Sequence, residues 1–346
     1  MKNGIYILAN DAVYDQLVAL LNSIEVNAGK EIPVCVIPYD NHLDKIKSEI
    51  TTRDNVTLFD DYSSIEYWEN FATEAWQGHS IAHKIWKERG LSNSGIYRLA
   101  RYRKYCCFDG QFDKFIFFDA DTLLMQPLDY VYQKLDEYDW VTNDFQYKSD
   151  INYIFDSSQK KLYEAFSNEI IKSQIFCSGW FASKKQMFDA DKTTKILESL
   201  KSGEADIMAW RDSDQTLLNY MVWRSGISFY NFAYHDVENA TGSHWSSNFE
   251  VIDHILYDKG KKLTYLHYMS VSSSKFTSLC QGEDVDIPYK EIFLHYRYLK
   301  SPESRPTVFT QPSAFAKIQK STSDFVSKKA NSLMYKYHQL QNFKNR

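Results

Sequence analysis

The sequence has no strong excess of one charge, few cysteines and no long apolar run, and each absence narrows what the protein can be. A formal net charge of −5 gives no reason to expect nucleic acid as the main partner. No run approaches the ~18 apolar residues of a membrane span, and the N-terminus begins with a predicted strand rather than a signal peptide. Five cysteines, an odd number without metal-ligand spacing, favour a reducing compartment. We therefore expect a cytoplasmic protein without a nucleic-acid partner.

Two phosphate-binding motifs are also absent. No G-x-G-x-x-G follows the first predicted strand, and no G-x-x-x-x-G-K-[ST] occurs in the chain, which argues against dinucleotide cofactors and P-loop nucleotide hydrolysis. Aromatic residues, in contrast, are abundant, with 25 Tyr, 22 Phe and 8 Trp. Aromatic rings stack on sugars, but a large core uses them as well, and the core is the simpler interpretation.

Strands and helices alternate along the chain. We predict strands at 4–9, 32–37, 56–59, 115–121, 140–142, 175–182, 227–229 and 263–268. Helices are predicted at 13–28, 43–50, 96–108, 193–201 and 216–222. This alternation predicts an α/β fold with a mostly parallel, Rossmann-like central sheet flanked by helices. Ligands of such sheets bind outside the carboxyl ends of the strands, where several of the predicted strands are followed by Asn or Asp.

The segment F-I-F-F-D-A-D-T-L-L at 115–124 organises the rest of the chain. Its apolar run predicts a strand buried on both faces, and because alternate side chains face the same way, Asp119 and Asp121 are expected to point together. Two carboxylates near a buried strand end need a partner, and hard oxygen ligands suit Mg²⁺ or Mn²⁺. The alternative is a strand that simply ends, with both carboxylates solvated. These ten residues alone leave both interpretations open.

Two further features have a functional and an ordinary interpretation. Residues 96–108 predict a strongly basic helix, in which Arg98 and Arg101 lie three residues apart and share a face. These arginines either reach a diphosphate at the neighbouring strand ends or form ion pairs on a solvated surface. His267 stands between Leu and Tyr in a predicted strand, which by itself is typical of a core residue rather than a ligand.

The composition changes near the C-terminus. Residues 313–346 hold seven basic residues and one acidic residue, and their apolar residues fall roughly on one helical face. A basic amphipathic helix of this kind can make a peripheral contact with the inner face of a membrane. The alternative is a helix that docks on the domain or on a second subunit of a homodimer. We therefore expect one domain over 1–300 and a basic amphipathic, helical C-terminal extension over 301–346.

Five blocks, in order, resemble the glycogenin-like family-eight glycosyltransferases of GT-A fold. They are L-A-N-D-A at 8–12 with Tyr14, F-D-A-D-T-L at 118–123, F-C-S-G at 176–179, S-D-Q-T-L-L-N at 213–219 and L-T-Y-L-H-Y at 263–268. The resemblance covers roughly 1–275. It implies a metal-dependent enzyme that moves a hexose from a nucleotide sugar, generally a UDP-sugar, to an acceptor hydroxyl with retention at the anomeric carbon. The acceptor, whether a glycan, a lipid or a small molecule, is not identified.

The resemblance also implies roles for individual residues. Asp119, Asp121 and His267 would bind the metal, Mn²⁺ or Mg²⁺, and Asp214 and Gln215 would lie beside the donor sugar as the catalytic candidates. The nucleotide sugar would contact residues at several strand ends, namely Ala9, Asn10, Asp11, Tyr14, Arg98, Arg101, Asp119, Ala120, Asp121, Ser178, Gly179 and Lys275.

Three positions depart from the family pattern. Cys177 replaces an Asn, Ser213 replaces a Gly, and the segment after His267 lacks Pro-Trp and has its lysine, Lys275, displaced. Two other functions therefore stay open. A phosphohydrolase resembling the haloacid-dehalogenase family would use Asp119 as nucleophile, although that motif normally lies on the first strand. A non-catalytic nucleotide-sugar-binding protein is suggested only by Cys177.

Overall fold

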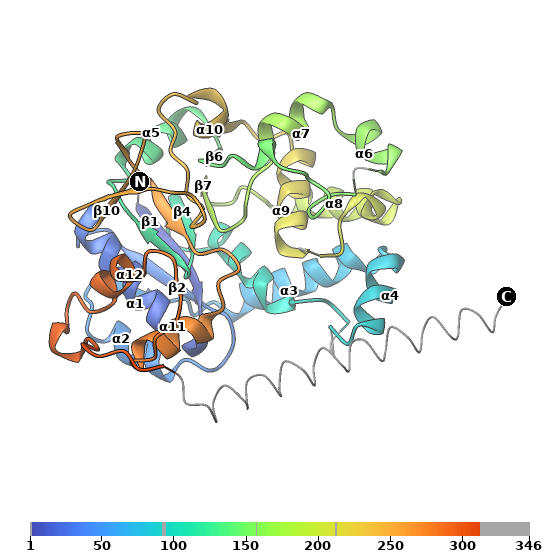
Figure 1. The fold of residues 1–346 in the computed structure, drawn as a ribbon. Helices are drawn as coiled ribbons and strands as arrows, with labels where there is room; N and C mark the ends of the chain where they lie inside the picture. Colours follow the sequence, from blue (N-terminus) through green and yellow to red (C-terminus); the bar gives the residue numbers. More distant parts are fainter. Residues whose placement is uncertain (1, 92–94, 157, 212, 312–346) are drawn as a thin grey trace.

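The computed structural model describes residues 2–91, 95–156, 158–211 and 213–311. Its centre is a seven-stranded sheet in the order β3-β2-β1-β4-β7-β6-β8 (Figure 1). The strands are β1 (Asn3–Ala9), β2 (Val34–Pro38), β3 (Val56–Leu58), β4 (Lys114–Asp119), β6 (Trp140–Thr142), β7 (Trp180–Lys184) and β8 (Phe229–Asn231). β7 runs antiparallel to both of its neighbours, and the other strands of this sheet run in one direction. The predicted α/β fold with a mostly parallel central sheet flanked by helices is confirmed.

The unbroken apolar runs of the central strands arise because both faces of the sheet are covered. In β1, Ile5 and Ile7 face one apolar cluster, whereas Tyr6 and Leu8 face another, as the alternation of a strand requires. The first cluster holds α1 (Tyr14–Asn27), α2 (Asp44–Ile50) and α5 (Asp129–Glu137) against the sheet. The second holds α3 (Tyr62–Gln77) and the 3₁₀ helix η2 (Leu99–Phe108).

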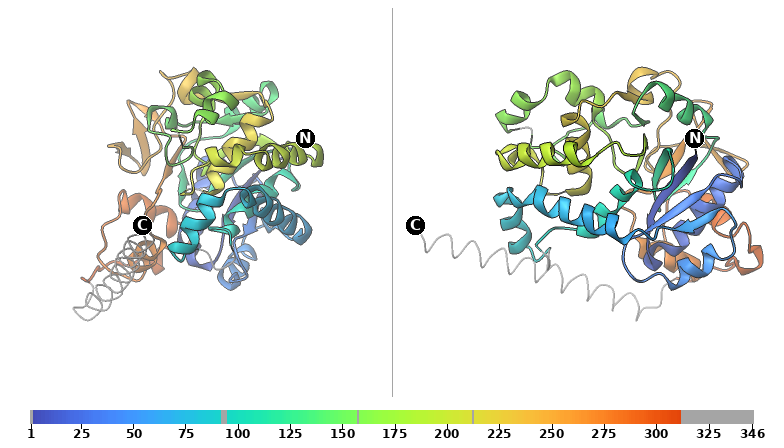
Figure 2. Two further views of the ribbon diagram at one scale, coloured as in Figure 1. Left: turned by 90° about the vertical axis from the view of Figure 1, so that its right-hand side faces the viewer. Right: turned by 180° about the vertical axis from the view of Figure 1, so that it is seen from behind.

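Beyond the second face, helices form a side lobe (Figures 1 and 2). It contains part of α3 together with α4 (Ser80–Glu88), α6 (Lys160–Ala165), α7 (Asn168–Gln174), α8 (Ala190–Lys201), η4 (Glu204–Ile207) and α9 (Ser213–Arg224). Much of the aromatic content of the sequence lies in this part of the core, where Trp68, Trp76 and Trp86 are fully buried. A large core therefore accounts for many of the aromatic residues.

Smaller elements complete the structure around α1. β5 (Thr122–Leu124) pairs antiparallel with β12 (Tyr265–His267), and β9 (Glu250–Ile252), β10 (Ile255–Asp258) and β11 (Lys261–Lys262) form a three-stranded sheet. The remaining elements are η1 (Asp11–Val13), η3 (Gln146–Lys148), α10 (Phe232–His235), α11 (Ser273–Cys280), α12 (Lys290–Arg297) and η5 (Pro302–Ser304). α12 packs on α1, where the Asn22 amide donates to the Tyr296 carbonyl at 2.7 Å and Arg297 pairs with Asp15 at 2.7 Å.

The predicted domain boundary falls within a segment that still contacts the domain. Past residue 300 the chain returns to the end of α11, where the Thr310 N–H donates to the Gly282 carbonyl at 2.9 Å. Residues 312–346 lie outside the described residues, so the division at 300, the helical C-terminal extension, and its membrane or homodimer contact stay predictions. Within the described part of the chain, no helix combines the length and the apolar character that crossing a bilayer requires.

Three predicted elements differ from the structure. Residues 96–108 contain a 3₁₀ helix that begins at Leu99, and its buried Tyr102, Tyr105 and Phe108 repeat at its period of three. The strand predicted at 175–182 begins only at Trp180. Before it, the side-chain amide of Asn219 bonds both the N–H and the carbonyl of Phe176, in place of a strand partner.

The prediction that the strand continues through Asp121 is also wrong, since β4 ends at Asp119. Ala120 and Asp121 form a turn, in which the Thr122 hydroxyl donates to the Asp119 carbonyl at 2.8 Å. The turn, rather than strand alternation, brings the two carboxylates to one place. The helix predicted at 216–222 is α9, which starts earlier, at Ser213.

Candidate active site

A cavity of about 850 Å³ opens at the carboxyl ends of β1, β2 and β4, between the sheet and the side lobe. Most of the predicted site residues line it, namely Ala9, Asn10, Arg98, Arg101, Asp119, Ala120, Asp121, Ser178, Gly179, Asp214, Gln215 and His267. These residues come from segments far apart in the sequence, and the sheet topology gathers them because parallel strands end at a common edge.

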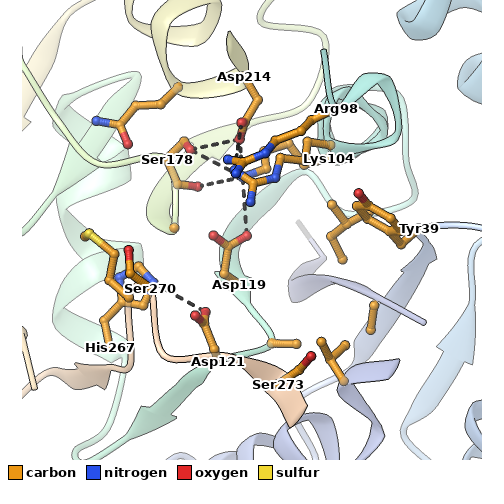
Figure 3. Close-up of a pocket in the computed structure, with 18 of the residues that line it drawn as sticks. Tyr39, Arg98, Lys104, Asp119, Asp121, Ser178, Asp214, His267, Ser270 and Ser273 are labelled. Carbon is orange, nitrogen blue, oxygen red and sulfur yellow. Dashed lines mark hydrogen bonds and ion pairs between the residues drawn. The ribbon is translucent and has the colours of Figure 1, made fainter. Parts of the chain in front are cut away.

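Asp119, Asp121 and His267 form the lower wall of this cavity (Figure 3). One ligand atom from each lies within 4.8 Å of the others. The pairing of β12 with β5 places His267 opposite Thr122, and the Tyr268 N–H donates to the Asp121 carbonyl at 2.9 Å. His267 is therefore fixed beside the turn by backbone hydrogen bonds rather than by sequence proximity.

Charge is concentrated at these three side chains. His267 Nε2 lies 3.3 Å from Asp121 Oδ1. Burial lowers the pKa of His267, but the charge of Asp121 and the hydrogen bond to it outweigh burial, so the pKa is raised well above its usual value. Burial also raises the pKa of Asp119, against the opposing charge of Lys104. The raised pKa favours a positive charge on the imidazole beside Asp121.

Gly179 leaves room for an ion at this wall. A Cβ at position 179 would lie 2.4 Å from His267 Cε1 and 3.1 Å from Asp119 Oδ2, which is too close to both. The space beside the three ligand atoms is therefore open only because residue 179 has no side chain. Two carboxylates and one imidazole are a suitable donor set for Mn²⁺, and the carboxylates alone also suit Mg²⁺. The residues present fit the predicted divalent cation.

The opposite wall is built around a buried lysine that the sequence analysis missed. Lys104 Nζ lies 3.0 Å from Asp214 Oδ2 and 3.3 Å from Asp119 Oδ1 (Figure 3). It also donates to the carbonyl and the hydroxyl oxygen of Ser178, each at 3.3 Å. Only 2% of Lys104 is exposed. One ammonium thus connects the metal wall with α9, and the charges of Asp119 and Asp214 outweigh burial and raise its pKa.

Asp214 and Gln215 enter the cavity from the first turn of α9. Burial raises the pKa of Asp214, but the charges of Lys104 and Arg101 lower it much further, so this carboxylate is ionised despite its burial. Arg101 lies 3.5 Å from Asp214 Oδ1, and the Ser178 hydroxyl donates to Oδ2 at 3.2 Å. The buried Nε2 of Gln215 has no hydrogen-bond partner among the described residues, which leaves an amide donor for a substrate.

Three residues predicted to contact the nucleotide sugar lie elsewhere. The carboxylate of Asp11 accepts from the backbone N–H groups of Lys45 and Ile46 at the start of α2. The hydroxyl of Tyr14 donates to Glu49 at 2.9 Å, also in α2. The Lys275 ammonium donates to the backbone carbonyl of Asp286 at 3.1 Å and does not line the cavity. Ser270 and Ser273 line the cavity in that region instead.

The sequence contained one signal for Lys104. Arg101 and Lys104 stand three residues apart, the period of a 3₁₀ helix, so they share a face of η2, and Arg98 precedes the helix at the same interval. Reading the segment as an α-helix obscured this repeat. Tyr39, Tyr153 and Arg211 also line the cavity, and no local pattern singles them out, because each stands alone in a loop.

Cys177, which stands where the resemblance expects an Asn, also lines the cavity. Its N–H donates to the partly buried carboxylate of Asp144, and its thiol interacts with His267. Burial raises the pKa of the thiol, against the effect of that imidazole. The substitution therefore places a neutral group beside the predicted metal ligand.

The fold is that of the GT-A glycosyltransferases. The galactosyltransferase LgtC, solved in complex with donor and acceptor sugar analogs, is similar to this chain with a TM-score of 0.51 and 13% identity, over 90% of this chain and 98% of LgtC. GlyE of Streptococcus pneumoniae TIGR4 gives a TM-score of 0.45 and 13% identity, over 90% of this chain and 66% of GlyE.

The bifunctional glycosyltransferase WbbM gives a TM-score of 0.47 and 14% identity over 88% of this chain, which spans about half of WbbM (51%). No protein-family profile and no curated protein sequence matches the chain. At these identities the likeness shows the fold alone, so the activity must be argued from the site.

Proposed function

We propose that this chain is a metal-dependent glycosyltransferase that moves a hexose from a nucleotide sugar, a UDP-sugar, to an acceptor hydroxyl. The observation that carries this proposal is the gathering of Asp119, Asp121 and His267 within 4.8 Å of one another in the wall of a large cavity. The cavity lies where sheets of this kind bind ligands, and its volume of about 850 Å³ suits a nucleotide sugar together with part of an acceptor.

The nucleoside is assigned to the side of the cavity formed by the sheet. Ala9 is the last residue of β1, Asn10 follows it, and Tyr39 follows β2, so all three stand at neighbouring strand ends. Asn10 is held by Asp40, whose carboxylate accepts from its amide at 2.7 Å. Tyr39 presents an aromatic ring on which a base can stack. Asp11 and Tyr14 support this region through α2 rather than from within the cavity.

Asp119, Asp121 and His267 would hold the cation, Mn²⁺ or Mg²⁺. When bound, such an ion supplies Lewis-acid stabilisation of the negative charge that develops on a departing diphosphate. His267 must lose its proton to act as a ligand, and Asp121 keeps the ring beside the site. Cavity-lining Arg101 adds fixed positive charge near the same diphosphate.

Asp214 is proposed to act on the sugar. Glycosyl transfer passes through an oxocarbenium-like transition state, which an ionised carboxylate stabilises when it stands close to the anomeric carbon. Lys104 and Ser178 bind Oδ2 of Asp214, whereas Oδ1 faces Arg101 at 3.5 Å and has no hydrogen-bond partner among the described residues. Gln215 offers its buried amide to a sugar hydroxyl. In this arrangement Asp214 is the candidate nucleophile if retention proceeds by double displacement.

The proposal is tested with purified protein and a panel of nucleotide sugars, by measuring nucleotide binding and donor hydrolysis with and without Mn²⁺. We expect Mn²⁺-dependent binding and hydrolysis of a UDP-sugar. Asp121→Asn should lower hydrolysis by at least about 10²-fold to 10³-fold, because it removes a charged group that acts on the transition state. Asp129→Asn, an exposed carboxylate in α5, is the matched control and should behave as wild type.

Three outcomes contradict the proposal. Undiminished turnover of Asp121→Asn with Mn²⁺ supplied would overturn the metal assignment. Phosphate release from an aryl phosphate, lost in Asp119→Asn, would show the phosphohydrolase in which Asp119 is the nucleophile. Tight UDP binding without turnover of any donor over a broad acceptor panel would show a non-catalytic nucleotide-sugar-binding protein.

A further inference from the structure

Two arginines of the cavity wall, Arg98 and Arg211, form what we call the arginine pair. Both side chains are exposed and both line the cavity. Within residues 2–311, leaving aside the undescribed positions, neither makes an ion pair with a carboxylate. Arg101 and Lys104, in contrast, are used by Asp214, at 3.5 and 3.0 Å. The arginine pair is therefore positive charge that the carboxylates of the described residues leave unpaired.

The arginine pair is held in place by one aromatic cluster. The Arg98 guanidinium lies 4.4 Å from the centre of the Tyr97 ring, and that of Arg211 lies 5.4 Å from the centre of the Trp210 ring. Both residues contact the buried Trp86, whose ring centre lies 6.1 Å from that of Tyr97 and whose indole N–H donates to the backbone carbonyl of Trp210 at 3.0 Å. Two loops that are distant in sequence thus present their cations from the same support.

The backbone at Arg98 adds a second observation. Its φ is +56°, in the left-handed region, which is unfavourable for a residue other than glycine. η2 begins at the next residue, so this conformation sets the direction in which Arg98 leaves the helix. Strained conformations of this kind persist where the surrounding structure fixes them, and they cluster at ligand-binding positions.

The position of Arg211 indicates which part of the reaction this charge serves. Arg211 precedes α9 and enters the cavity from the side lobe, three residues before Asp214. The residues assigned to the nucleoside, Ala9 and Asn10, enter from the sheet. An acceptor must approach the sugar beside Asp214 from the side that the nucleotide leaves open. Arg211 stands on that side, and Arg98 lines the same cavity.

Resting on the proposed function, we propose that the arginine pair binds an acidic group carried by the acceptor. Guanidinium groups match phosphate and carboxylate oxygens with two parallel hydrogen bonds. The acceptor is then a sugar or glycan that carries a phosphate or a uronic-acid carboxylate near the accepting hydroxyl. Neutral sugars would leave the two like charges of the pair unopposed.

The test uses matched acceptors that differ only in charge. Methyl glycosides of glucose, galactose and mannose are compared with their 6-phosphates and their 6-carboxylates, with Mn²⁺ and the donor that supports hydrolysis. We expect kcat/KM for at least one acidic acceptor to exceed that of its neutral counterpart by tenfold or more. The advantage should shrink as ionic strength rises, because salt screens exposed charges. The phosphate and carboxylate arms show which acid is preferred.

Arg211→Gln tests the residue, and Arg89→Gln is its control. Arg89 also stacks on Trp210, at 4.5 Å from the ring centre, but does not line the cavity. Arg211→Gln should bring the ratio of kcat/KM for the acidic and neutral acceptors close to one, whereas Arg89→Gln should leave that ratio unchanged. A general loss of folding or of aromatic packing would affect both variants alike.

Two results would overturn the acidic-acceptor proposal. The first is that kcat/KM for the neutral glycosides equals that for their acidic counterparts, or that a preference for acidic acceptors survives Arg211→Gln. The other is a panel on which nothing turns over and on which no acidic glycoside binds the complex with UDP and Mn²⁺ better than its neutral counterpart in a saturation-transfer measurement. Either result, with Mn²⁺-dependent donor hydrolysis intact, leaves the glycosyltransferase proposal standing, so the two failures are distinguishable.

Discussion

On one wall of the cavity, Asp119, Asp121 and His267 gather two carboxylates around one imidazole, whereas on the other wall Asp214 meets both Lys104 and Arg101. The first wall is electrically incomplete without a cation, and the His267 proton fills that place only partly. The second wall neutralises itself with groups from the protein.

This difference in pairing corresponds to two functions of buried carboxylates. The carboxylates proposed to bind an ion are paired less completely, since Asp119 shares Lys104 with Asp214 and Asp121 faces the ring of His267. Gly179 keeps the space beside them open. A carboxylate that must stay charged against a sugar is paired permanently, since burial alone would protonate it. Lys104 belongs to both walls, and so it is the residue at which the distinction is most easily broken.

The largest effect is expected from Lys104→Met, which removes the permanent partner. Asp214 would then be a buried carboxylate with only Arg101 nearby, and we expect the free energy of unfolding to fall by about 3–5 kcal/mol at pH 7. Urea unfolding measures the loss. Arg103→Gln is the control from the same helix: its partner Glu69, at 2.7 Å, is only partly buried, so the loss should stay below about 1 kcal/mol.

The stability difference between Lys104→Met and wild type should also change with pH. In wild type the pKa of Asp214 is held well below its usual value of about 4, so its contribution to stability is present above pH 4 and is lost only as pH falls through the lowered pKa. Without Lys104 the pKa of the same carboxylate would be raised. The free energy of unfolding of the variant would then recover as the carboxylate becomes protonated. The difference between Lys104→Met and wild type should therefore narrow between pH 7 and pH 4; a constant difference would contradict the pairing.

Gly179→Ala should disturb the other wall alone. The added Cβ would lie 2.4 Å from His267 Cε1, so the ring must move away from the carboxylates. We expect the affinity for Mn²⁺ to fall by about 10-fold to 100-fold, as for other changes that reorient a ligand. Gly78→Ala, whose Cβ would meet nothing closer than 3.6 Å, is the control. Equal Mn²⁺ affinities in titration calorimetry would show that the ion binds elsewhere.

The smallest effect is expected from a change in pH, which should alter the affinity for Mn²⁺. Because the pKa of His267 is raised well above its usual value, mainly by Asp121 against the effect of burial, a metal must displace a proton at neutral pH. The dissociation constant for Mn²⁺ should therefore rise by about tenfold for each pH unit below that pKa. Calorimetry in buffers of different ionisation enthalpy counts the released proton. A dissociation constant independent of pH between 6 and 8 would contradict this prediction.

The sequence was sufficient to predict the fold because its strongest signals are local. The apolar runs of β1 and β4 and the helical spacing in α1 follow from burial on both faces of one sheet. The boundaries of irregular elements were less accessible. The 3₁₀ helix η2 and the turn at Asp121 depend on contacts with α9 and β12, which no local pattern contains.

The candidate site was predicted in part for the same reason. Asp119 and Asp121 stand out because carboxylates follow an apolar run, whereas His267 and Asp214 were assigned through a family resemblance. Lys104 was missed because a buried lysine looks like any surface lysine until its two acidic partners are known. Lys275 was placed near the diphosphate by the same resemblance, and in the structure it faces Asp286.

Because β7 runs antiparallel to its neighbours, its first residues, rather than its last, lie at the cavity. The two ends of this strand should therefore tolerate insertions differently. The residues just before β7, Ser178 and Gly179, lie at the cavity, whereas the residues after it lie near Asp113 at the opposite edge of the sheet, where the Lys185 N–H donates to its carbonyl at 3.0 Å. In the parallel strands, the residues after the strand lie on the side of the cavity, and the residues before it lie on the opposite side of the sheet. Insertions after Lys184 should therefore be tolerated by the chemistry, while a single added residue before Trp180 would move the floor of the site.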